Sequence, residues 1–287
     1  MKFLKDYRAL RGAPRELWLA LAIKVLEGFA YFSMTIVLML WLRSELGLSY
    51  ERAGWVYGLW GTLIGIYSML IGALLDRIGV RKSLLLGTSL MLASRGIMTF
   101  LSEPMWLWLA MFGLMPLGQA LGIPVLATGI RRYTTTKTRT FGFSVFYACL
   151  NLGAVVGGVF IDYAGKWRQT GVDIDFVGWT IHLPIYRVIF FSAFIATGLS
   201  FGLAMLMREI KINEEGELEK FIPGAQFKPS SSSLKARLLG WIRPLTDTAK
   251  EGRFWRFLLF LVLLIGVRAT TRYLESVFPA YLKAELG

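Results

Sequence analysis

Seven long apolar runs dominate this sequence, and each is long enough to cross a membrane as a helix. A hydrocarbon core about 30 Å thick requires roughly 20 consecutive apolar residues per helix. Because lipid offers the backbone no hydrogen-bond partners, a span must satisfy its own N–H and C=O groups. We therefore predict an all-α, multi-pass membrane protein with spans near residues 17–42, 53–75, 83–101, 105–128, 141–163, 188–207 and 257–282.

The composition supports a membrane protein and argues against other classes. Hydrophobic residues make up 55% of the 287 positions and charged residues only 18%, which excludes disorder and is unlike an ordinary soluble enzyme. The single cysteine, Cys149, rules out an intramolecular disulfide, and one histidine adds too few ligands for a metal centre. Without a nucleophile triad or phosphate loop at readable spacing, we expect neither an enzyme nor a cofactor.

The formal charge of +13 would suit either nucleic acid or the cytoplasmic side of a membrane protein. If the N-terminus is placed in the cytoplasm, 22 of the 32 lysines and arginines fall in cytoplasmic segments and 5 in external ones. Because cytoplasmic loops of membrane proteins carry the basic excess, we predict a cytoplasmic N-terminus in a cell or inner membrane. The lipid bilayer is thus the expected partner, and nucleic acid is not.

The runs divide the chain into four parts. We predict a cytoplasmic N-terminus at 1–16, a six-helix bundle at 17–207, a cytoplasmic central loop at 208–256 and a seventh span at 257–287. The external stretch 172–186 alternates polar and apolar residues, which favours a small hairpin. In the central loop an acidic patch at 214–219 is followed by a Pro-Ser break, and 234–242 is patterned as a surface amphipathic helix or a plain linker.

The connection between the second and third runs carries an ordered motif. It consists of a glycine, three residues, Asp-Arg, one residue, a glycine and two basic residues: Gly72, Asp76, Arg77, Gly79, Arg81 and Lys82, with Val80 where a basic residue is commoner. This string resembles the signature loop of the major facilitator superfamily. The resemblance implies a fold of about twelve spans in two bundles that rock against each other, with Asp76 facing the second bundle. We therefore expect a fragment or truncated product whose C-terminal bundle is missing.

Three further segments resemble the proton-dependent oligopeptide transporters within that superfamily. They are Phe146-Tyr147 followed by Asn151 and Gly153, the glycine-rich stretch 118–124, and Glu27-Gly28-Phe29-Ala30-Tyr31-Phe32. Three positions depart from that family's pattern. Lys24 replaces its first Glu, Gly28 its Arg, and Ile123 the lysine linked to proton coupling and peptide binding. The peptide-binding machinery is thus largely missing, and peptide cannot simply be carried over as the substrate.

Ionisable residues inside the runs are the main candidate site, because burying charge in a membrane is costly. Helical rise places Glu27, Arg95 and Arg268 near the membrane midplane, where secondary transporters bind substrate. Two sets follow helical i, i+3 or i+4, i+7 spacing and therefore each line one face: Lys24, Glu27 and Tyr31 on the first helix, and Arg268, Arg272 and Glu275 on the seventh. The resemblance implies that both helices line the central cavity.

Four basic and two acidic groups among these candidates favour a small anionic or zwitterionic solute, peptide-like or an organic acid. Glu27 is the best candidate for protonation coupled to transport, since an apolar place and a neighbouring Arg act oppositely on its pKa. An alternative is that Glu27 only neutralises Arg95 or Lys24 structurally. Gln119, Tyr147 and Asn151 could line the cavity or bond between helices.

These features together predict a secondary active transporter, coupled to protons, that works by alternating access. Two other classes remain open. A half-transporter acting as a membrane scaffold would share the same spans. A seven-helix receptor fits the span count but predicts an external N-terminus, which the charge bias contradicts, and a retinal protein would need lysine where Arg268 stands.

Overall fold

The computed structural model describes residues 12–167, 171–176, 179–213 and 215–223, together with scattered positions between 251 and 281. The chain forms two compact units, 1–224 and 225–287, and the first of them contains the long helices and both hairpins. Of the seventh predicted span, positions 259, 260, 263, 264, 278 and 281 are described and helical. The predicted amphipathic helix at 234–242 lies outside the described residues.

Long helices account for the first six predicted spans. They are α2 (Arg15–Leu46), α3 (Tyr50–Ile78), α4 (Val80–Phe100), a continuous helical stretch of α5 (Pro104–Trp108), η1 (Leu109–Leu114) and α6 (Met115–Arg132), then α7 (Arg139–Ala164) and α8 (Ile185–Met205). Among the described residues, α2, α4, 104–132, α7 and α8 are long and apolar enough to cross a membrane. The chain is a multi-pass membrane protein, as the sequence predicts.

Local signals fix several helix ends. The Ser49 hydroxyl accepts a hydrogen bond from the Arg52 amide and so caps α3. Gly47 ends α2 in the left-handed conformation, with a φ of 63° that favours glycine. Pro104 occupies the first turn of α5, where its missing N–H costs nothing. The turn η1 is π-helical, so the fourth span is not one regular helix.

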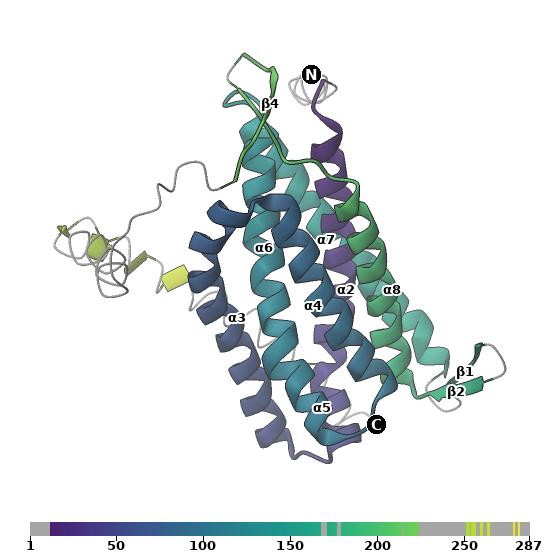
Figure 1. Ribbon diagram of the computed structural model, residues 1–287. Coiled ribbons are helices and arrows are strands. Elements are labelled where there is room, and N and C mark those ends of the chain that lie inside the picture. The colour runs from purple at the N-terminus through teal and green to yellow at the C-terminus, as the bar shows by residue number, and fades with distance from the viewer. Residues whose placement is uncertain are drawn as a thin grey trace, which may run out of the picture. The chain divides into compact units, whose positions relative to one another are not determined.

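The helices form an elongated bundle (Figure 1). Helix α2 packs against α7 and α8, α4 packs against α6 and α8, and α3 lies along α6. Glycines allow the closest approaches: a β-carbon on Gly118 of α6 would lie 2.6 Å from Met91 Cγ and 2.9 Å from Gly87 O, both on α4. The apolar core therefore lies between tightly packed helices rather than in a sheet.

Two short antiparallel hairpins lie outside the helices. In the first, β1 (Val172–Phe176) pairs with β2 (Trp179–Leu183) with Val172 opposite Leu183, which confirms the hairpin predicted from alternation. The second, β3 (Ile210–Ile212) with β4 (Leu218–Lys220), occupies the acidic stretch after the sixth span and was not expected from the sequence. Both are small additions to a helical fold.

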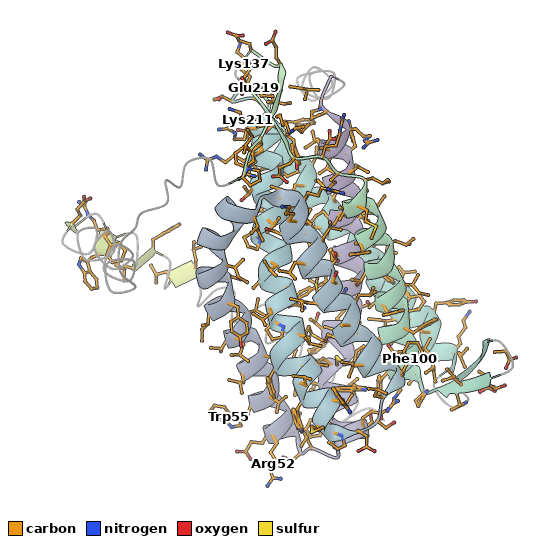
Figure 2. All side chains as sticks on the ribbon, viewed as in Figure 1. Arg52, Trp55, Phe100, Lys137, Lys211 and Glu219 are labelled. Atoms are coloured by element: carbon orange, nitrogen blue, oxygen red, sulfur yellow. The ribbon has the colours of Figure 1, made fainter. Side chains whose placement is uncertain are left out.

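The two ends of the bundle differ in character. Lys137, in the loop between α6 and α7, lies at the same end as Lys211 and Glu219 of the second hairpin, whereas Arg52 and Trp55 lie at the opposite end (Figure 2). The guanidinium of Arg15 donates to Leu206 O over 2.6 Å, which brings the start of α2 and the end of α8 together at the first of these ends. We call it the basic end.

Candidate functional site

Lys24 and Glu27 lie one helical turn apart on α2, inside the bundle. Lys24 is buried, and its ammonium lies 4.6 Å from the ring centroid of Phe146 on α7. That contact joins α2 to the Phe-Tyr segment singled out in the sequence, because a cation over an aromatic face is attracted by the ring quadrupole. Lys24 also interacts electrostatically with Glu27 across this turn of the helix.

Arg95 of α4 completes this group, which we call the charged centre: Lys24, Glu27 and Arg95. Arg95 has no exposed surface, and its Nη1 donates a hydrogen bond to the Thr197 hydroxyl of α8. Its charge interacts with that of Glu27. Arg95 therefore lies within the packed bundle, bonded to α8 and close enough to Glu27 of α2 for their charges to interact.

The Glu27 carboxylate is incompletely bonded. Its Oε1 is buried and accepts no hydrogen bond from any described residue, and the Ser200 hydroxyl lies beside the carboxylate without normal hydrogen-bond geometry. Arg95 likewise leaves Nε and Nη2 without acceptors in the described part of the chain. Because unpaired polar groups are costly when buried, Glu27 Oε1 has unused capacity to accept a hydrogen bond or a proton, and the two Arg95 nitrogens have unused capacity to donate to water.

The other predicted site residues are placed in different surroundings. Tyr31 stacks on Trp60 of α3, with centroids 6.3 Å apart. Gln119 of α6 is buried, and both its amide oxygen and nitrogen lack partners in the described structure. Tyr147 and Asn151 lie on an exposed face of α7. The structure thus brings Lys24, Glu27 and Arg95 together inside the bundle, while Tyr147 and Asn151 are exposed on α7.

Several predicted residues cannot be placed. Arg268, Arg272 and Glu275 lie outside the described residues. Gly72, Asp76 and Arg77 lie within α3, where the structure describes their backbone and not their surroundings. The rest of the motif loop is described: Gly79 has a φ of 85°, Arg81 donates to the Met205 carbonyl over 3.2 Å, and Lys82 is exposed. The loop lies at the basic end of the bundle.

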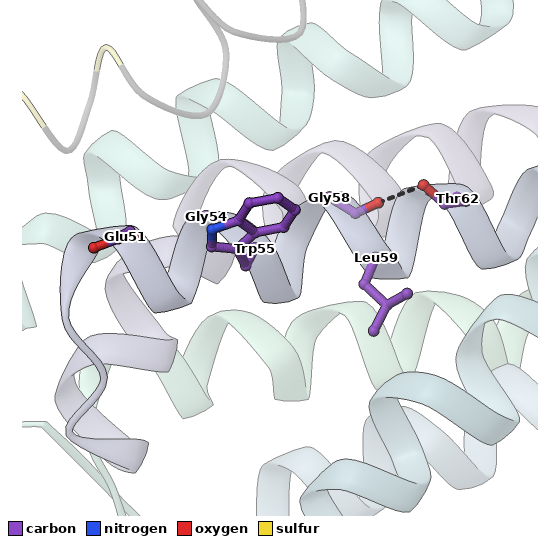
Figure 3. A pocket seen from close by; sticks show the side chains of 6 residues that line it. All are labelled: Glu51, Gly54, Trp55, Gly58, Leu59 and Thr62. Carbon is purple, nitrogen blue, oxygen red and sulfur yellow. Dashed lines mark hydrogen bonds between the residues drawn. The ribbon is translucent and has the colours of Figure 1, made fainter.

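A shallow pocket lies elsewhere, along α3 (Figure 3). Its lining follows one stripe of that helix, in which the glycines Gly54 and Gly58 leave room beside Trp55. The Thr62 hydroxyl donates to the Gly58 carbonyl over 2.9 Å, so this polar group is satisfied within the helix. The pocket contains no member of the charged centre and offers little chemistry of its own.

Comparison with known proteins decides the family. The model of the Major Facilitator Superfamily matches residues 21–287. The chain belongs to the Major Facilitator Superfamily. This membership agrees with the motif loop at 72–82 and separates the chain from the seven-helix receptors that share its predicted span count.

Solved structures with the same fold are peptide transporters of this superfamily. The peptide transporter POT in complex with sulfate has a TM-score of 0.61 and 20% identity, with 88% of this chain and 46% of that one covered. Tetrameric PepTSo2 has a TM-score of 0.57 and 17% identity, with 88% of this chain and 53% of that one covered. A structure from work on substrate recognition in proton dependent oligopeptide transporters has a TM-score of 0.56 and 17% identity, with 90% of this chain and 54% of that one covered.

These likenesses establish the fold, and they agree with the oligopeptide-transporter resemblance of the first, fourth and fifth spans. The chain spans about half the length of these structures. Sequence reasoning missed two polar residues of α8, Thr197 and Ser200, that face the charged centre. Their spacing of three in an otherwise apolar helix was the available signal, because i and i+3 residues share a face.

Proposed function

We propose that this protein contributes the N-terminal bundle of a secondary active transporter, coupled to protons, for a small anionic or zwitterionic solute. The observation that carries the proposal is the carboxylate of Glu27, held inside an apolar bundle with two cations acting on its charge and with one oxygen that no described residue bonds. Charged groups at such depth are costly and generally belong to a substrate or ion pathway. The family membership and the peptide transporters of like fold support transport as the activity.

Glu27 is the group that we assign to proton coupling. It lies about 18 Å along α2 from Arg15, at 1.5 Å per residue, and so near the middle of a bilayer span. Its counter-charge Arg95 is fixed to Thr197, so movement of the solute or of Lys24 changes the balance of charge at the carboxylate. Protonation of Glu27 would then accompany the rocking of one bundle against the other.

Lys24 is the described cation that we assign to the solute's anionic group, because Nη1 of Arg95 is already bonded to Thr197 within the bundle. Arg268, Arg272 and Glu275 are proposed to complete the site from the seventh span. The departures from the peptide-transporter pattern at Lys24, Gly28 and Ile123 favour a peptide-like solute or organic acid over a general peptide substrate. The basic end is proposed to face the cytoplasm.

The test uses the protein as its cell produces it, reconstituted in liposomes with an imposed pH gradient. Labelled dipeptides and mono- and dicarboxylates serve as probes, and accumulation is compared with solute exchange at equal pH. In Glu27→Gln we expect accumulation to be lost while exchange persists. In Arg268→Gln we expect weaker transport of every anionic probe. Glu51→Gln, an exposed change on α3, is the matched control and should behave as the wild type.

Several outcomes would contradict the proposal. Gradient-driven accumulation that survives Glu27→Gln would remove the coupling role, and unchanged transport of all anionic probes in Arg268→Gln would remove the substrate class. If no probe is moved by a folded protein at any gradient, transport itself is contradicted and the membrane-scaffold alternative gains support.

A further inference from the structure

Glu209, just past the end of α8, supplies the N-terminal cap of α4. Its Oε1 accepts a hydrogen bond from the Val80 amide over 2.8 Å and its Oε2 accepts one from the Arg81 amide over 2.9 Å. Helix α4 has neither a side-chain cap from its own flanking residue Gly79 nor an acidic residue in its first turn. A carboxylate 129 positions away therefore satisfies two of the four free amides and the positive end of the helix dipole.

The same carboxylate reaches the end of α6. Arg132 Nη1 lies 3.2 Å from Glu209 Oε1, and the pair is largely shielded, with 12% and 18% of the two side chains exposed. The Arg132 guanidinium also lies over the Phe221 ring, 3.8 Å from its centroid. The Phe221 amide in turn donates to the Glu209 carbonyl over 3.2 Å, so the chain folds back on itself across the hairpin β3–β4.

The turn between α3 and α4 fits closely under this arrangement. A β-carbon on Gly79 would lie 2.6 Å from Glu209 Oε1 and 2.7 Å from Pro223 Cγ. Its φ of 85° is also one that side-chain-bearing residues rarely adopt. The Arg81 guanidinium closes the connection to α8 through the Met205 carbonyl. One carboxylate and its immediate neighbours thus join the ends of α4, α6 and α8.

We propose that Glu209, Arg132 and Phe221 form a clasp that holds the α3–α4 turn in one conformation and makes the basic ends of α4, α6 and α8 move as one rigid unit. Glu209 is its closing residue, and Arg132 and Phe221 hold Glu209 in place. The clasp governs local opening of the motif loop. This conformational role is independent of which solute is carried or which ion drives transport.

Amide hydrogen exchange on the intact, detergent-purified chain tests the clasp without any transport assay. The reporter is the exchange rate of the Val80 and Arg81 amides, and peptides from the middle of α4 serve as the internal reference. Glu209→Gln removes the charge while keeping the shape. Glu219→Gln is the matched control, because it changes another carboxylate of the same hairpin, one whose partners among the described residues are Lys211 and Asn213 of that hairpin.

In Glu209→Gln we expect the two amides to exchange about fivefold to tenfold faster, as loss of a capping carboxylate predicts, with the middle of α4 unchanged. Glu219→Gln should stay within about twofold of the wild type. Arg132→Lys keeps a charge but loses the planar guanidinium over Phe221, and should give an intermediate increase.

Wild-type exchange at Val80 and Arg81 in Glu209→Gln would overturn the clasp. Equal acceleration in Glu209→Gln and Glu219→Gln would overturn the role of Glu209 in it. If Glu209→Gln accelerates every peptide through general unfolding, Arg132→Lys decides: local acceleration at the two amides supports the clasp, and wild-type exchange there overturns it.

Discussion

Gly28 of α2 and Gly153 of α7 face each other where the two helices cross. A β-carbon on Gly28 would lie 3.4 Å from Gly153 Cα, and one on Gly153 would lie 2.9 Å from the carbonyl carbon of Gly28. The resemblance to the oligopeptide transporters would place an arginine at Gly28, whereas the glycine found here permits close packing of the two helices. Small residues at a crossing allow the backbones of membrane helices to approach.

Gly153→Ala should therefore destabilise the bundle. Its new methyl group would meet backbone atoms, including Phe29 N at 2.6 Å, and these cannot move without shifting α2. We expect a loss of about 1–3 kcal/mol, seen as a lower midpoint of thermal unfolding in detergent. Gly158→Ala is the control, because a β-carbon there meets nothing within 4 Å; it should be neutral or slightly stabilising. Equal midpoints for the two variants would contradict the packing argument.

Thr197→Val should weaken the charged centre without changing its shape. The Thr197 hydroxyl accepts from Arg95 and donates to the Ala193 carbonyl over 2.8 Å, both within buried surroundings. Removing a hydrogen bond to a buried charged group costs about 1.5–3 kcal/mol, measured by the same unfolding midpoint. Thr62→Val is the matched control: it also loses a bond to the carbonyl four residues earlier, but on an exposed face. A larger loss in the control would contradict this prediction.

Arg187→Gln should loosen the end of the bundle opposite the basic end. Arg187 binds both carboxylate oxygens of Glu45, over 3.1 and 2.7 Å, and the Ser102 hydroxyl over 3.0 Å, which joins the start of α8 to the end of α2. Because the pair is mostly buried, breaking it should cost about 2–3 kcal/mol in unfolding experiments. Arg187→Lys keeps the charge and should lose less, since lysine lacks the two-pronged geometry; an equal loss would argue against that geometry.

Tyr133, just past the end of α6, should make stability fall at high pH. Burial, the larger cause, and the neighbouring Glu209 carboxylate raise the pKa of Tyr133 above its ordinary value. Because the pKa of Tyr133 is higher in the folded state than in the unfolded state, its contribution to folding stability is fully present at pH values below the ordinary tyrosine pKa. That contribution is lost as the pH rises above the ordinary pKa. The wild type should therefore lose more stability than Tyr133→Phe above about pH 10.

The unfolding stabilities of the wild type and of Tyr133→Phe are compared at neutral and at high pH. The titration of the other tyrosines affects both proteins equally and so cancels in the difference. At neutral pH, Tyr133→Phe should unfold at nearly the wild-type temperature, because the Tyr133 hydroxyl is buried without a partner in the described structure. Parallel losses for both proteins between pH 8 and pH 11 would contradict the assignment, whatever their absolute stability.

Run length predicted the helices well, because the requirement for about 20 apolar residues per span leaves few alternatives. The hairpin containing Val172 and Leu183 was predicted for a similar reason: strict alternation has a single structural meaning. Helical spacing likewise placed Lys24 and Glu27 on one face, where the structure has them. What these successes share is that neighbouring residues along the chain carry the signal.

The features missed by the sequence are long-range. Glu209 follows the sixth span in an ordinary polar stretch, and nothing in its neighbourhood indicates that its partners are Val80 and Arg81. The hydrogen bond between Arg95 and Thr197 depends on how α4 and α8 are each rotated about their own axes. Residue spacing within either helix does not determine that rotation. Depth could be estimated for Arg95, but the direction of its side chain could not. Arg268 remains a prediction from sequence, outside the described residues.

The π-helical turn η1 acts as a one-residue insertion in the fourth span. An added residue turns everything beyond it by about 100° relative to a regular helix. The aromatic segment with Trp106 and Trp108 is therefore out of phase with the glycine-rich segment around Gly118 and Gln119. Deleting one residue from Leu109–Leu114 would make the aromatic and glycine-rich segments one regular helix. For Gln119 to stay buried in that helix, the aromatic segment would have to turn about the helix axis.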